Sequence, residues 1–431
     1  MDYQQENNVW VIGHKNPDTD SICAAICYSN LKNRLQDGFH YIPKRAGSIN
    51  EETKYVLQHF GVESPEYAED AGAQVKDIAF RRTAGVSGHI SLKKAWELMK
   101  TENVMTLAVT SASDKLEGLI ITGDIAESYM DVYDNHILSR ARTQYKNIVE
   151  TLNGTLLAGN EHAYFLRGKV VVATGSRDVI EECIESDDLV IVGDRDETHI
   201  CALEENASCM VVTGGTQVSA QVLEMANRRD CVVIITPYDT FTAARLINQS
   251  MPIKYFMKKE NFVTFDIDDY VDEVREVMSK KRHRDFPVLD DQRRYLGMVS
   301  RRNLLNMHKK KLILVDHNEK SQAIDGIEGA EILEIIDHHR LGSLETMSPV
   351  FFRNQPLGCT STIVYQMYCE SGIEIEEKIA GLLLSAILSD TLMFRSPTCT
   401  KADHEAARAL AAIAKVDIVD LADRMFRAGC D

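Results

Sequence analysis

The sequence lacks the features that mark secreted, membrane-spanning or nucleic-acid-binding proteins. Its ten cysteines form no CxxC pair, its longest strongly apolar run, residues 379–388, is too short to span a bilayer, and its N-terminus, MDYQQENN, is polar and acidic. The formal net charge of −17 argues against a nucleic-acid backbone or an anionic membrane as the main partner. We therefore expect a reduced, cytoplasmic protein without disulfides, signal peptide or transmembrane helix.

Length and composition predict a globular chain with about two to four domains. The 431 residues are 44% hydrophobic and 26% charged, as in an ordinary folded protein. Within residues 1–68, strands are expected at 9–12 and 41–44, and helices at 21–35 and 51–59. This alternation is typical of a parallel α/β sheet.

The first expected strand ends in a loop, GHKNPDTDS, that is rich in metal ligands. Gly13 ends the strand, and Thr19 or Asp20 caps the helix that follows. His14, Asp18 and Asp20 place one imidazole and two carboxylates at the carboxyl end of a strand, a set that suits a divalent metal. The alternative is that the two aspartates are turn and cap residues and His14 is a surface histidine.

An internal repeat follows this first segment. One copy, at about residues 73–130, contains VKDI, a helix that Ser91 opens, the strand TLAVT, the turn SASDK and the strand LEGLIIT. The order recurs at about 252–307, and the endings LEGLIITGDIA and YLGMVSRRNLL place Thr122 and Ser300 at the same position. Basic residues in the second copy suit an anionic ligand, or form a solvated face: Lys280, Lys281, Arg282, Arg284, Arg293, Arg301 and Arg302.

Residues 152–248, between the two copies, predict another α/β unit. Its expected strands are GKVVVATG, DLVIVGDRDE, SCMVVTGG and DCVVIITPYDT, with helices between them. Gly214 and Gly215 are either part of a phosphate-binding loop or ordinary turn residues. We expect a structural or interface role for this unit.

From about residue 311 the first pattern resumes. The strand in KLILVDHNE ends in Asp316 and His317, and the strand in AEILEIIDHHRLG ends in Asp337, His338 and His339. Two such strand ends put carboxylate and imidazole ligands along one edge of a parallel sheet.

Two later helices carry further candidates. The turn at 358–362 opens a helix whose N-terminus either receives an anion or is capped by Thr360 and Ser361. The apolar helix that follows ends near Asp390, and a buried helix seldom ends on an aspartate without a partner.

These candidates form a set large enough for two metal ions. A carboxylate such as Asp316 can bridge two metals, which together activate a water and neutralise a phosphoryl group. We therefore expect hydrolysis of a phosphoanhydride or phosphodiester; no Ser–His–Asp set, P-loop lysine or covalent nucleophile competes with it in the sequence. The predicted ligands are His14, Asp18, Asp20, Asp316, His338 and Asp390.

The repeat, with its G-[LM]-[IV]-x-x-x-[DN] ending, resembles a pair of CBS domains, and GDRDE followed by VVTGG resembles the DRTGG domain. The CBS resemblance implies that adenine nucleotides (AMP, ADP and ATP) act as regulators. It assigns nucleotide contacts to Thr122 and Asp124 in the first module and to Ser300 and Asn303 in the second. Asn303 stands where the pattern has Asp, which weakens one half-site.

Four ordered motifs, HKNPDTDS, VDHNE, IIDHHR and LSDT, resemble the DHH phosphoesterase superfamily and, within it, the CBS-containing family II inorganic pyrophosphatases. Asp18-Thr19-Asp20 has the pyrophosphatase form, since exonucleases of the superfamily tend to carry DGD. The resemblance implies two Mn²⁺ or Co²⁺ ions, with Mg²⁺ on the pyrophosphate. One ion would lie on His14, Asp18 and Asp316, and the other on Asp20, Asp316, His338 and Asp390.

The same resemblance gives roles to two further residues. It implies that His339 contacts the electrophilic phosphate and that Asp337 orients a histidine. The alternative functions are a DHH-type nucleotide phosphodiesterase and a catalytically impaired nucleotide-binding fragment.

The expected architecture is an α/β protein in which a parallel-sheet DHH domain is interrupted by two CBS modules flanking a DRTGG-like domain. The expected boundaries are 1–68 and 309–431 for the DHH domain, 69–135 and 249–308 for the CBS modules, and 152–248 for the DRTGG-like domain. In the family a further domain supplies cations that grip pyrophosphate, and the chain ends at 430–431, where its linker would begin. The resemblance thus predicts a truncated chain with impaired hydrolysis, and a homodimer.

Overall fold

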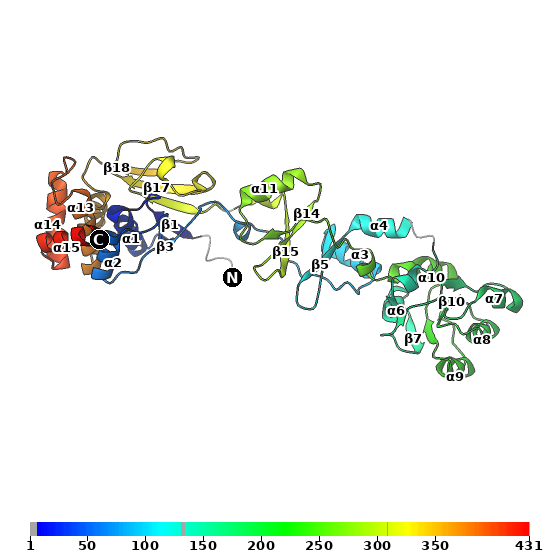
Figure 1. The fold of residues 1–431 in the computed structure, drawn as a ribbon. Helices are drawn as coiled ribbons and strands as arrows, with labels where there is room; N and C mark the ends of the chain where they lie inside the picture. The colour runs from blue at the N-terminus through cyan, green and yellow to red at the C-terminus, as the bar shows by residue number, and fades with distance from the viewer. Residues whose placement is uncertain (1–6, 131–133, 308, 431) are drawn as a thin grey trace. The chain divides into compact units, whose positions relative to one another are not determined.

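The computed structural model describes residues 7–130, 134–307 and 309–430. By its internal contacts the chain divides into two compact units (Figure 1). Unit 1 comprises Met1–Ala79, Asp268–Arg282 and Arg301–Asp431, and unit 2 comprises Phe80–Ile267 and His283–Ser300. Segments from both ends of the sequence therefore fold together in unit 1. Residues 131–133, near the predicted end of the first CBS module, lie outside the described residues.

Unit 1 is built on a six-stranded sheet in the order β18-β17-β16-β1-β2-β3, and every pair in it is parallel. The predicted parallel α/β sheet is thus confirmed, with strands from both parts of the sequence side by side. The strands are β1 (Asn8–Ile12), β2 (His40–Arg45), β3 (Glu66–Tyr67), β16 (Lys311–Val315), β17 (Glu331–Asp337) and β18 (Phe351–Asn354).

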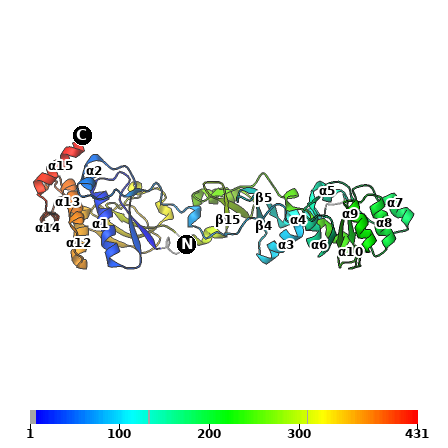
Figure 2. The same cartoon turned by 90° about the horizontal axis from the view of Figure 1, so that it is seen from below.

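Alternate residues of these strands face opposite sides of the sheet, as the pleat requires. Val11 and Ile313 belong to the core under the helices, whereas Ile12 and Leu312 pack on the other face. Figures 1 and 2 show α1, α12 and α13 gathered on one side of this sheet. The helices of the unit are α1 (Thr19–Leu35), α2 (Glu51–His59), α11 (Val271–Lys280), α12 (Thr360–Ser371), α13 (Glu377–Asp390), α14 (Lys401–Ala414) and α15 (Ile418–Cys430).

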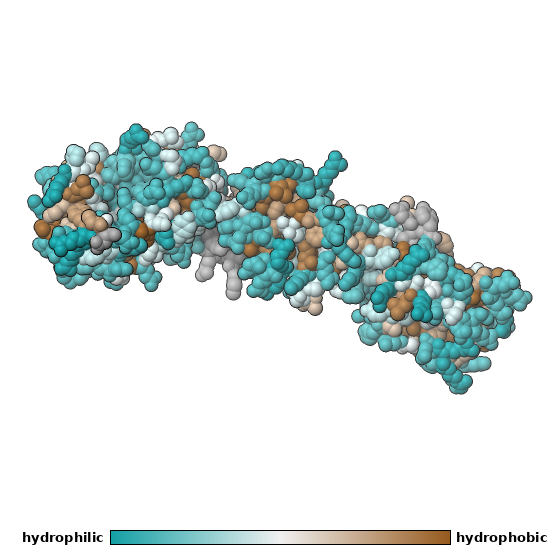
Figure 3. Space-filling model, in the orientation of Figure 1, coloured by the Kyte–Doolittle hydropathy of each residue, from teal (hydrophilic) through white to brown (hydrophobic). Residues whose placement is uncertain are grey.

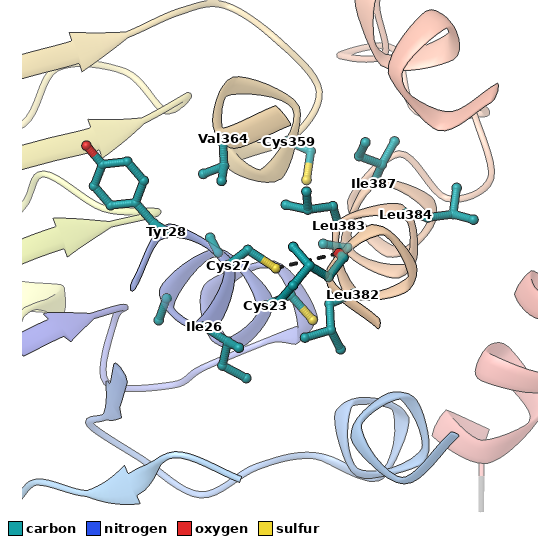
Figure 4. Close-up of a cluster of buried hydrophobic side chains, with 14 of the residues drawn as sticks. Cys23, Ile26, Cys27, Tyr28, Cys359, Val364, Leu382, Leu383, Leu384 and Ile387 are labelled. Atoms are coloured by element: carbon teal, nitrogen blue, oxygen red, sulfur yellow. Dashed lines mark hydrogen bonds between the residues drawn. The ribbon is translucent and has the colours of Figure 1, made fainter. Parts of the chain in front are cut away.

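The core between α1 and α13 is densely apolar. Figure 4 shows Cys23 and Cys27 of α1 beside Leu382 and Leu383 of α13, and all four side chains are fully buried. Burial of each large apolar side chain stabilises the folded state by about 1.5–3 kcal/mol. The packing fixes the first turn of α1 relative to the last turn of α13, where candidate ligands lie.

The connectivity of the sheet indicates where on its edge a ligand would bind. From β1 the chain runs to β2 and β3 on one side, whereas β16, β17 and β18 extend the sheet on the other side. The switch point therefore lies between β1 and β16, and ligands of open α/β sheets bind outside the carboxyl ends of the strands at such a point.

Unit 2 contains a five-stranded sheet in the order β7-β12-β11-β10-β9, parallel except for β7. Leu189 and Ile191 of β10 pack on one face of this sheet and Val190 and Val192 on the other. Its strands are β7 (Thr155–Ala158), β9 (Val170–Val172), β10 (Leu189–Val192), β11 (Cys209–Val212) and β12 (Val232–Ile235). Its helices are α6 (Tyr145–Thr151), α7 (Arg177–Cys183), α8 (Asp196–Glu204), α9 (Ala220–Arg228) and α10 (Thr240–Leu246).

The two copies of the repeat contribute smaller sheets to unit 2. The first pairs β4 (Thr106–Thr110) with β5 (Leu116–Ile121), and the second pairs β13 (Phe265–Asp266), β14 (Asp285–Leu289) and β15 (Tyr295–Ser300). Helices α3 (Leu92–Thr101) and α4 (Thr122–Met130) belong to the first copy, and α5 (Ile137–Arg140) with the short β6 (Thr143–Gln144) and β8 (Tyr164–Phe165) follows it.

The opening segment of each copy of the repeat is a 3₁₀ turn. VKDI in the first copy and IKYFM in the second form such turns at Val75–Asp77 and Ile253–Tyr255. At the first of these, the Asp77 carboxylate accepts the backbone N–H of Gln74 over 2.9 Å, which closes a turn. The second copy also ends in a 3₁₀ turn, Asn303–Asn306, where the first has α4.

The surface is mostly hydrophilic on the face that Figure 3 shows, with apolar residues in separate patches. All ten cysteines are free thiols. Among the described residues, no helix is long and apolar enough to cross a membrane.

Candidate metal centre

The loop after β1 is folded so that His14 and Asp18 face the carboxyl edge of the sheet. Asp18 caps α1, rather than Thr19 or Asp20 as expected, because its carboxylate accepts the backbone N–H of Ser21 over 2.9 Å. The Ser21 hydroxyl accepts the backbone N–H of His14 over 3.1 Å. A Cβ atom on Gly13 would lie only 1.8 Å from the Ser21 hydroxyl, so this close approach requires glycine. His14 Nε2 lies 3.7 Å from Asp18 and 3.4 Å from Asp316.

Asp316, directly after β16, is at the centre of the site. It is 1% exposed and has a left-handed backbone with φ 62°, which is uncommon for a residue other than glycine and is often found at functional sites. Its Oδ1 accepts the Thr360 hydroxyl over 3.0 Å, whereas its Oδ2 is buried and has no hydrogen-bond partner among the described residues. A buried carboxylate oxygen of this kind is costly unless it is paired with a cation.

The end of β17 supplies the third part of the site. The fully buried Asp337 accepts the backbone N–H of His338 and the Nδ1–H of His339 over 2.8 and 2.9 Å. The Nδ1–H of His338 donates to the Leu357 carbonyl over 3.0 Å. These bonds fix both rings. Nε2 of His338 stays buried, with no hydrogen-bond partner in the part of the chain that the structure describes.

The N-terminus of α12 receives the carboxylate of Asp20. The backbone N–H groups of Thr360 and Ser361 donate to the two oxygens of Asp20 over 2.7 and 3.0 Å, and the Ser361 hydroxyl donates over 2.6 Å. The helix N-terminus thus receives an anion, which is a side chain of α1. The alternative that Thr360 and Ser361 cap the helix is wrong, because their hydroxyls donate to Asp316 and Asp20 and Cys359 is the N-cap residue. Asp390, the last residue of α13, lies 3.7 Å from His338 Nε2.

The structure brings all six predicted ligands together. Candidate ligand atoms lie within 4.8 Å of one another in each of three overlapping groups, which are His14, Asp18 and Asp316; Asp20, Asp316, His338 and Asp390; and Asp316, His338 and His339. Asp316 is common to all three. Mixed carboxylate and imidazole donors with unpartnered buried atoms on Asp316 and His338 fit a divalent transition metal.

The electrostatics of the site reflect this crowding. Burial alone would lower the pKa of His14 and of His338, but the carboxylates beside them raise these values to about 10 and about 9. Burial raises the pKa of Asp20 to about 6 and raises that of Asp390 well above its usual range. Burial also acts against ionisation of Asp316, but the rings of His14 and His338 outweigh it and lower the pKa of Asp316. These shifts favour protons on His14, His338 and Asp390, at the positions where cations would bind.

Sequence reasoning missed several supporting residues. Asn318 is 4% exposed and donates to the Asp337 carboxylate and to the Arg340 carbonyl. Asp403 is fully buried and accepts hydrogen bonds at the turn before α12, and Glu52 accepts two side-chain hydroxyls beside the site. Both lie far in sequence from the motifs, so no local pattern signals them.

The predicted nucleotide contacts do not belong to this centre. In unit 2, Thr122 is the first residue of α4, and the Asp124 carboxylate accepts the Ile121 N–H over 2.9 Å and lies 3.4 Å from Lys258 Nζ. Ser300 ends β15. In unit 1, the Asn303 side chain donates to the Ala79 carbonyl over 2.7 Å.

Known protein families and relatives match both units of the chain. The DRTGG domain model matches residues 147–250 and the CBS domain model matches residues 253–309. A cobalt-dependent inorganic pyrophosphatase from Clostridium perfringens is 43% identical over 98% of this chain and 76% of its own length. A probable manganese-dependent inorganic pyrophosphatase from Thermotoga maritima is 38% identical over the same shares.

One solved structure resembles the regulatory region. The CBS and DRTGG domains of the Clostridium perfringens pyrophosphatase, crystallised with the activator diadenosine tetraphosphate, match 53% of this chain and 100% of that chain, with a TM-score of 0.51 and 36% identity.

Proposed function

The chain belongs to the metal-dependent inorganic pyrophosphatases that carry CBS and DRTGG domains, and from this membership we propose that it hydrolyses inorganic pyrophosphate to two phosphates at the edge of the unit 1 sheet. One observation carries the proposal. Three groups of candidate ligands share the buried Asp316 at the switch point of the sheet.

In this function His14, Asp18 and Asp316 hold one divalent ion, and Asp20, Asp316, His338 and Asp390 hold the other. Mn²⁺ or Co²⁺ are the expected ions, with Mg²⁺ on the substrate. When bound, two such ions supply an activated water and offset the charge of the phosphoryl group. The unpartnered oxygen of Asp316 and nitrogen of His338 support this assignment, because both atoms need a cation or a proton.

His339 and Asp337 act on the substrate side of the site. The Asp337 carboxylate receives the Nδ1–H of His339 and raises the pKa of that ring, so the imidazole is held in one orientation and readily carries a proton. The His339 side chain is 51% exposed, which leaves its Nε2 accessible to a phosphate of the substrate.

The direct test is phosphate release from pyrophosphate after removal of metals and readdition of Mn²⁺ or Co²⁺. Asp20→Asn removes the charge of a metal ligand and places an amide group against the backbone N–H donors of α12. Loss of a residue that only orients a ligand lowers activity by about 10- to 100-fold, and we expect Asp20→Asn to lower the rate of phosphate release by more than this. Unchanged activity in Asp20→Asn would refute the assignment. A parallel assay with a dinucleotide tests the phosphodiesterase alternative.

We further propose that adenine nucleotides bind the CBS modules, through Thr122 and Asp124 in the first module and Ser300 and Asn303 in the second, and change the rate of hydrolysis. The resemblance to a regulatory region crystallised with a dinucleotide activator supports this. The proposed setting is the cytoplasm, which the ten free thiols favour, and the proposed assembly is a homodimer, to be tested by light scattering.

A further inference from the structure

Glu52, on the first turn of α2, contacts the flanks of two ligand segments at once. Its Oε1 accepts the hydroxyl of Thr19 over 2.7 Å and the hydroxyl of Ser389 over 2.5 Å. Thr19 stands between Asp18 and Asp20, and Ser389 directly precedes Asp390. One carboxylate oxygen therefore joins the start of α1 to the end of α13.

We infer that Glu52 is a positioning residue that sets the spacing between Asp20 and Asp390 for the second metal ion. The inference rests on the proposed metal centre, in which these two aspartates belong to one ligand group. Both aspartates must be ionised to bind a cation, and two ionised carboxylates that share a site repel each other, which acts to separate α1 from α13. The bridge through Glu52 holds the two helix ends together and opposes this separation.

The surroundings of Glu52 make the bridge rigid. Asn50 caps α2 by accepting the backbone N–H of Thr53 over 2.8 Å, and Thr53 itself is fully buried. The Thr53 and Thr19 hydroxyls lie 3.0 Å apart. Because the single hydroxyl proton of Thr19 points to Glu52, the Thr53 hydroxyl donates to Thr19, which gives a directed chain of bonds that ends on the Glu52 carboxylate.

Neither bond contacts a metal ligand atom directly, so Glu52 is not a catalytic residue. Outer-shell partners orient ligands, and their loss weakens metal affinity by about 10- to 100-fold. The bridge differs from the contacts of α12 with Asp20, because those contacts do not reach α13.

The chain offers a matched set of variants. Glu52→Ala removes the bridge and a charge, whereas Glu52→Gln removes only the charge, since the amide oxygen still accepts both hydroxyls. Glu51→Ala removes the same charge from the preceding residue, which is exposed and pairs only with Lys54 among the interactions described. Ser389→Ala breaks one arm of the bridge and leaves Glu52 in place.

The measurements are the dissociation constant for Mn²⁺, by titration of the metal-free full chain, and the midpoint of thermal unfolding. We expect Glu52→Ala to weaken Mn²⁺ binding at least about tenfold, Ser389→Ala to weaken it less, and Glu52→Gln and Glu51→Ala to bind like the unaltered chain.

The inference is overturned if Glu52→Ala binds Mn²⁺ as the unaltered chain does, or if Glu52→Gln is as weak as Glu52→Ala, which would assign the effect to charge. If Glu52→Ala does not fold, unchanged Mn²⁺ binding by Ser389→Ala overturns it instead. A lowered unfolding midpoint with unchanged affinity also refutes it, since that is a structural role. Failure of the unaltered chain to bind Mn²⁺ would refute the metal centre itself, a different result from any of these.

Discussion

The carboxylate of Asp20 accepts the hydroxyl of Ser361 over 2.6 Å, although 341 positions of sequence separate the two residues. The bond joins the first turn of α1 to the first turn of α12. The same carboxylate accepts the backbone N–H groups of Thr360 and Ser361, which have no partner within the helix. The anion site of α12 is thus occupied from within the protein, and it holds Asp20 in place for a cation on its other side.

Ser361→Ala should weaken Mn²⁺ binding by about tenfold, because Asp20 then keeps only its backbone donors and can rotate. Ser371→Ala is the control on the same helix, since its hydroxyl donates to the Met367 carbonyl at an exposed position. Calorimetric titration of the metal-free protein measures both. Equal affinities in the two variants would contradict the positioning role of Ser361.

Metal binding should release protons. The pKa values of His14 and His338, about 10 and about 9, mean that both rings carry a proton at pH 7 in the metal-free protein, whereas a metal needs neutral imidazole. Apparent Mn²⁺ affinity should therefore rise with pH up to about 9. Titrations in buffers with different ionisation enthalpies measure the protons released, and identical enthalpies would contradict the prediction.

The same two rings should make the metal-free protein less stable at high pH. Their pKa values in the folded state lie above the ordinary value of 6.5, so the stabilisation is fully present below pH 6.5 and is lost as the pH rises through about 9 and about 10. The free energy of unfolding of the metal-free chain, from urea denaturation, should fall over this range. A rise would contradict the assigned directions.

Asp403 should be important for stability. Its buried carboxylate accepts the Gly358 N–H, the Thr362 hydroxyl, and both the N–H and the hydroxyl of Thr400, so it joins the turn before α12 to the start of α14. Asp403→Ala leaves these donors unpaired and should lower the free energy of unfolding by at least about 2 kcal/mol.

Asp403→Asn is the milder variant at the same position. An amide oxygen keeps the three bonds to Oδ2, and the Thr362 hydroxyl can turn to accept from the amide nitrogen. Urea denaturation measures both changes. An equally large loss in the two variants would show that charge, rather than hydrogen bonding, is what matters.

Nucleotide binding in unit 2 should depend on Thr122. Thr122→Val removes a hydroxyl with little change of shape, so AMP affinity should fall by about fivefold to tenfold, as expected for one hydrogen bond of about 1 kcal/mol. Thr101→Val is the control, because the Thr101 hydroxyl donates within α3 to the Glu97 carbonyl at an exposed position. If both variants bind AMP equally in calorimetry, Thr122 is not a nucleotide contact.

The fold class and the grouping of candidate ligands could be predicted from the sequence because both depend on local patterns. Apolar runs followed by Asp and His give parallel strands whose carboxyl ends meet at one edge. The position of Asp316 beside His14 follows from that rule once β1 and β16 are neighbours, which their register shows. The role of each ligand stays a prediction, as do the domain boundaries.

Other features could not be predicted, because they depend on contacts between distant segments. Nothing near Glu52 or Asp403 in the sequence indicates that their carboxylates reach Ser389 or Gly358. The 3₁₀ turn at Val75–Asp77 could not be predicted either, because the bond from the Gln74 N–H to the Asp77 carboxylate favours a turn over a short strand.

The division of unit 1 between the two ends of the sequence sets an order for its assembly on the ribosome. His14, Asp18 and Asp20 emerge first, but Asp316, His338 and Asp390 follow only after the whole Phe80–Ile267 segment of unit 2 has been synthesised. Because domains fold as their chain is completed, the five-stranded sheet of unit 2 can form while β1 still lacks its neighbour β16. The nascent chain therefore carries an unpaired edge on β1 until β16 is made, and an incomplete set of candidate ligands until translation has passed Asp390.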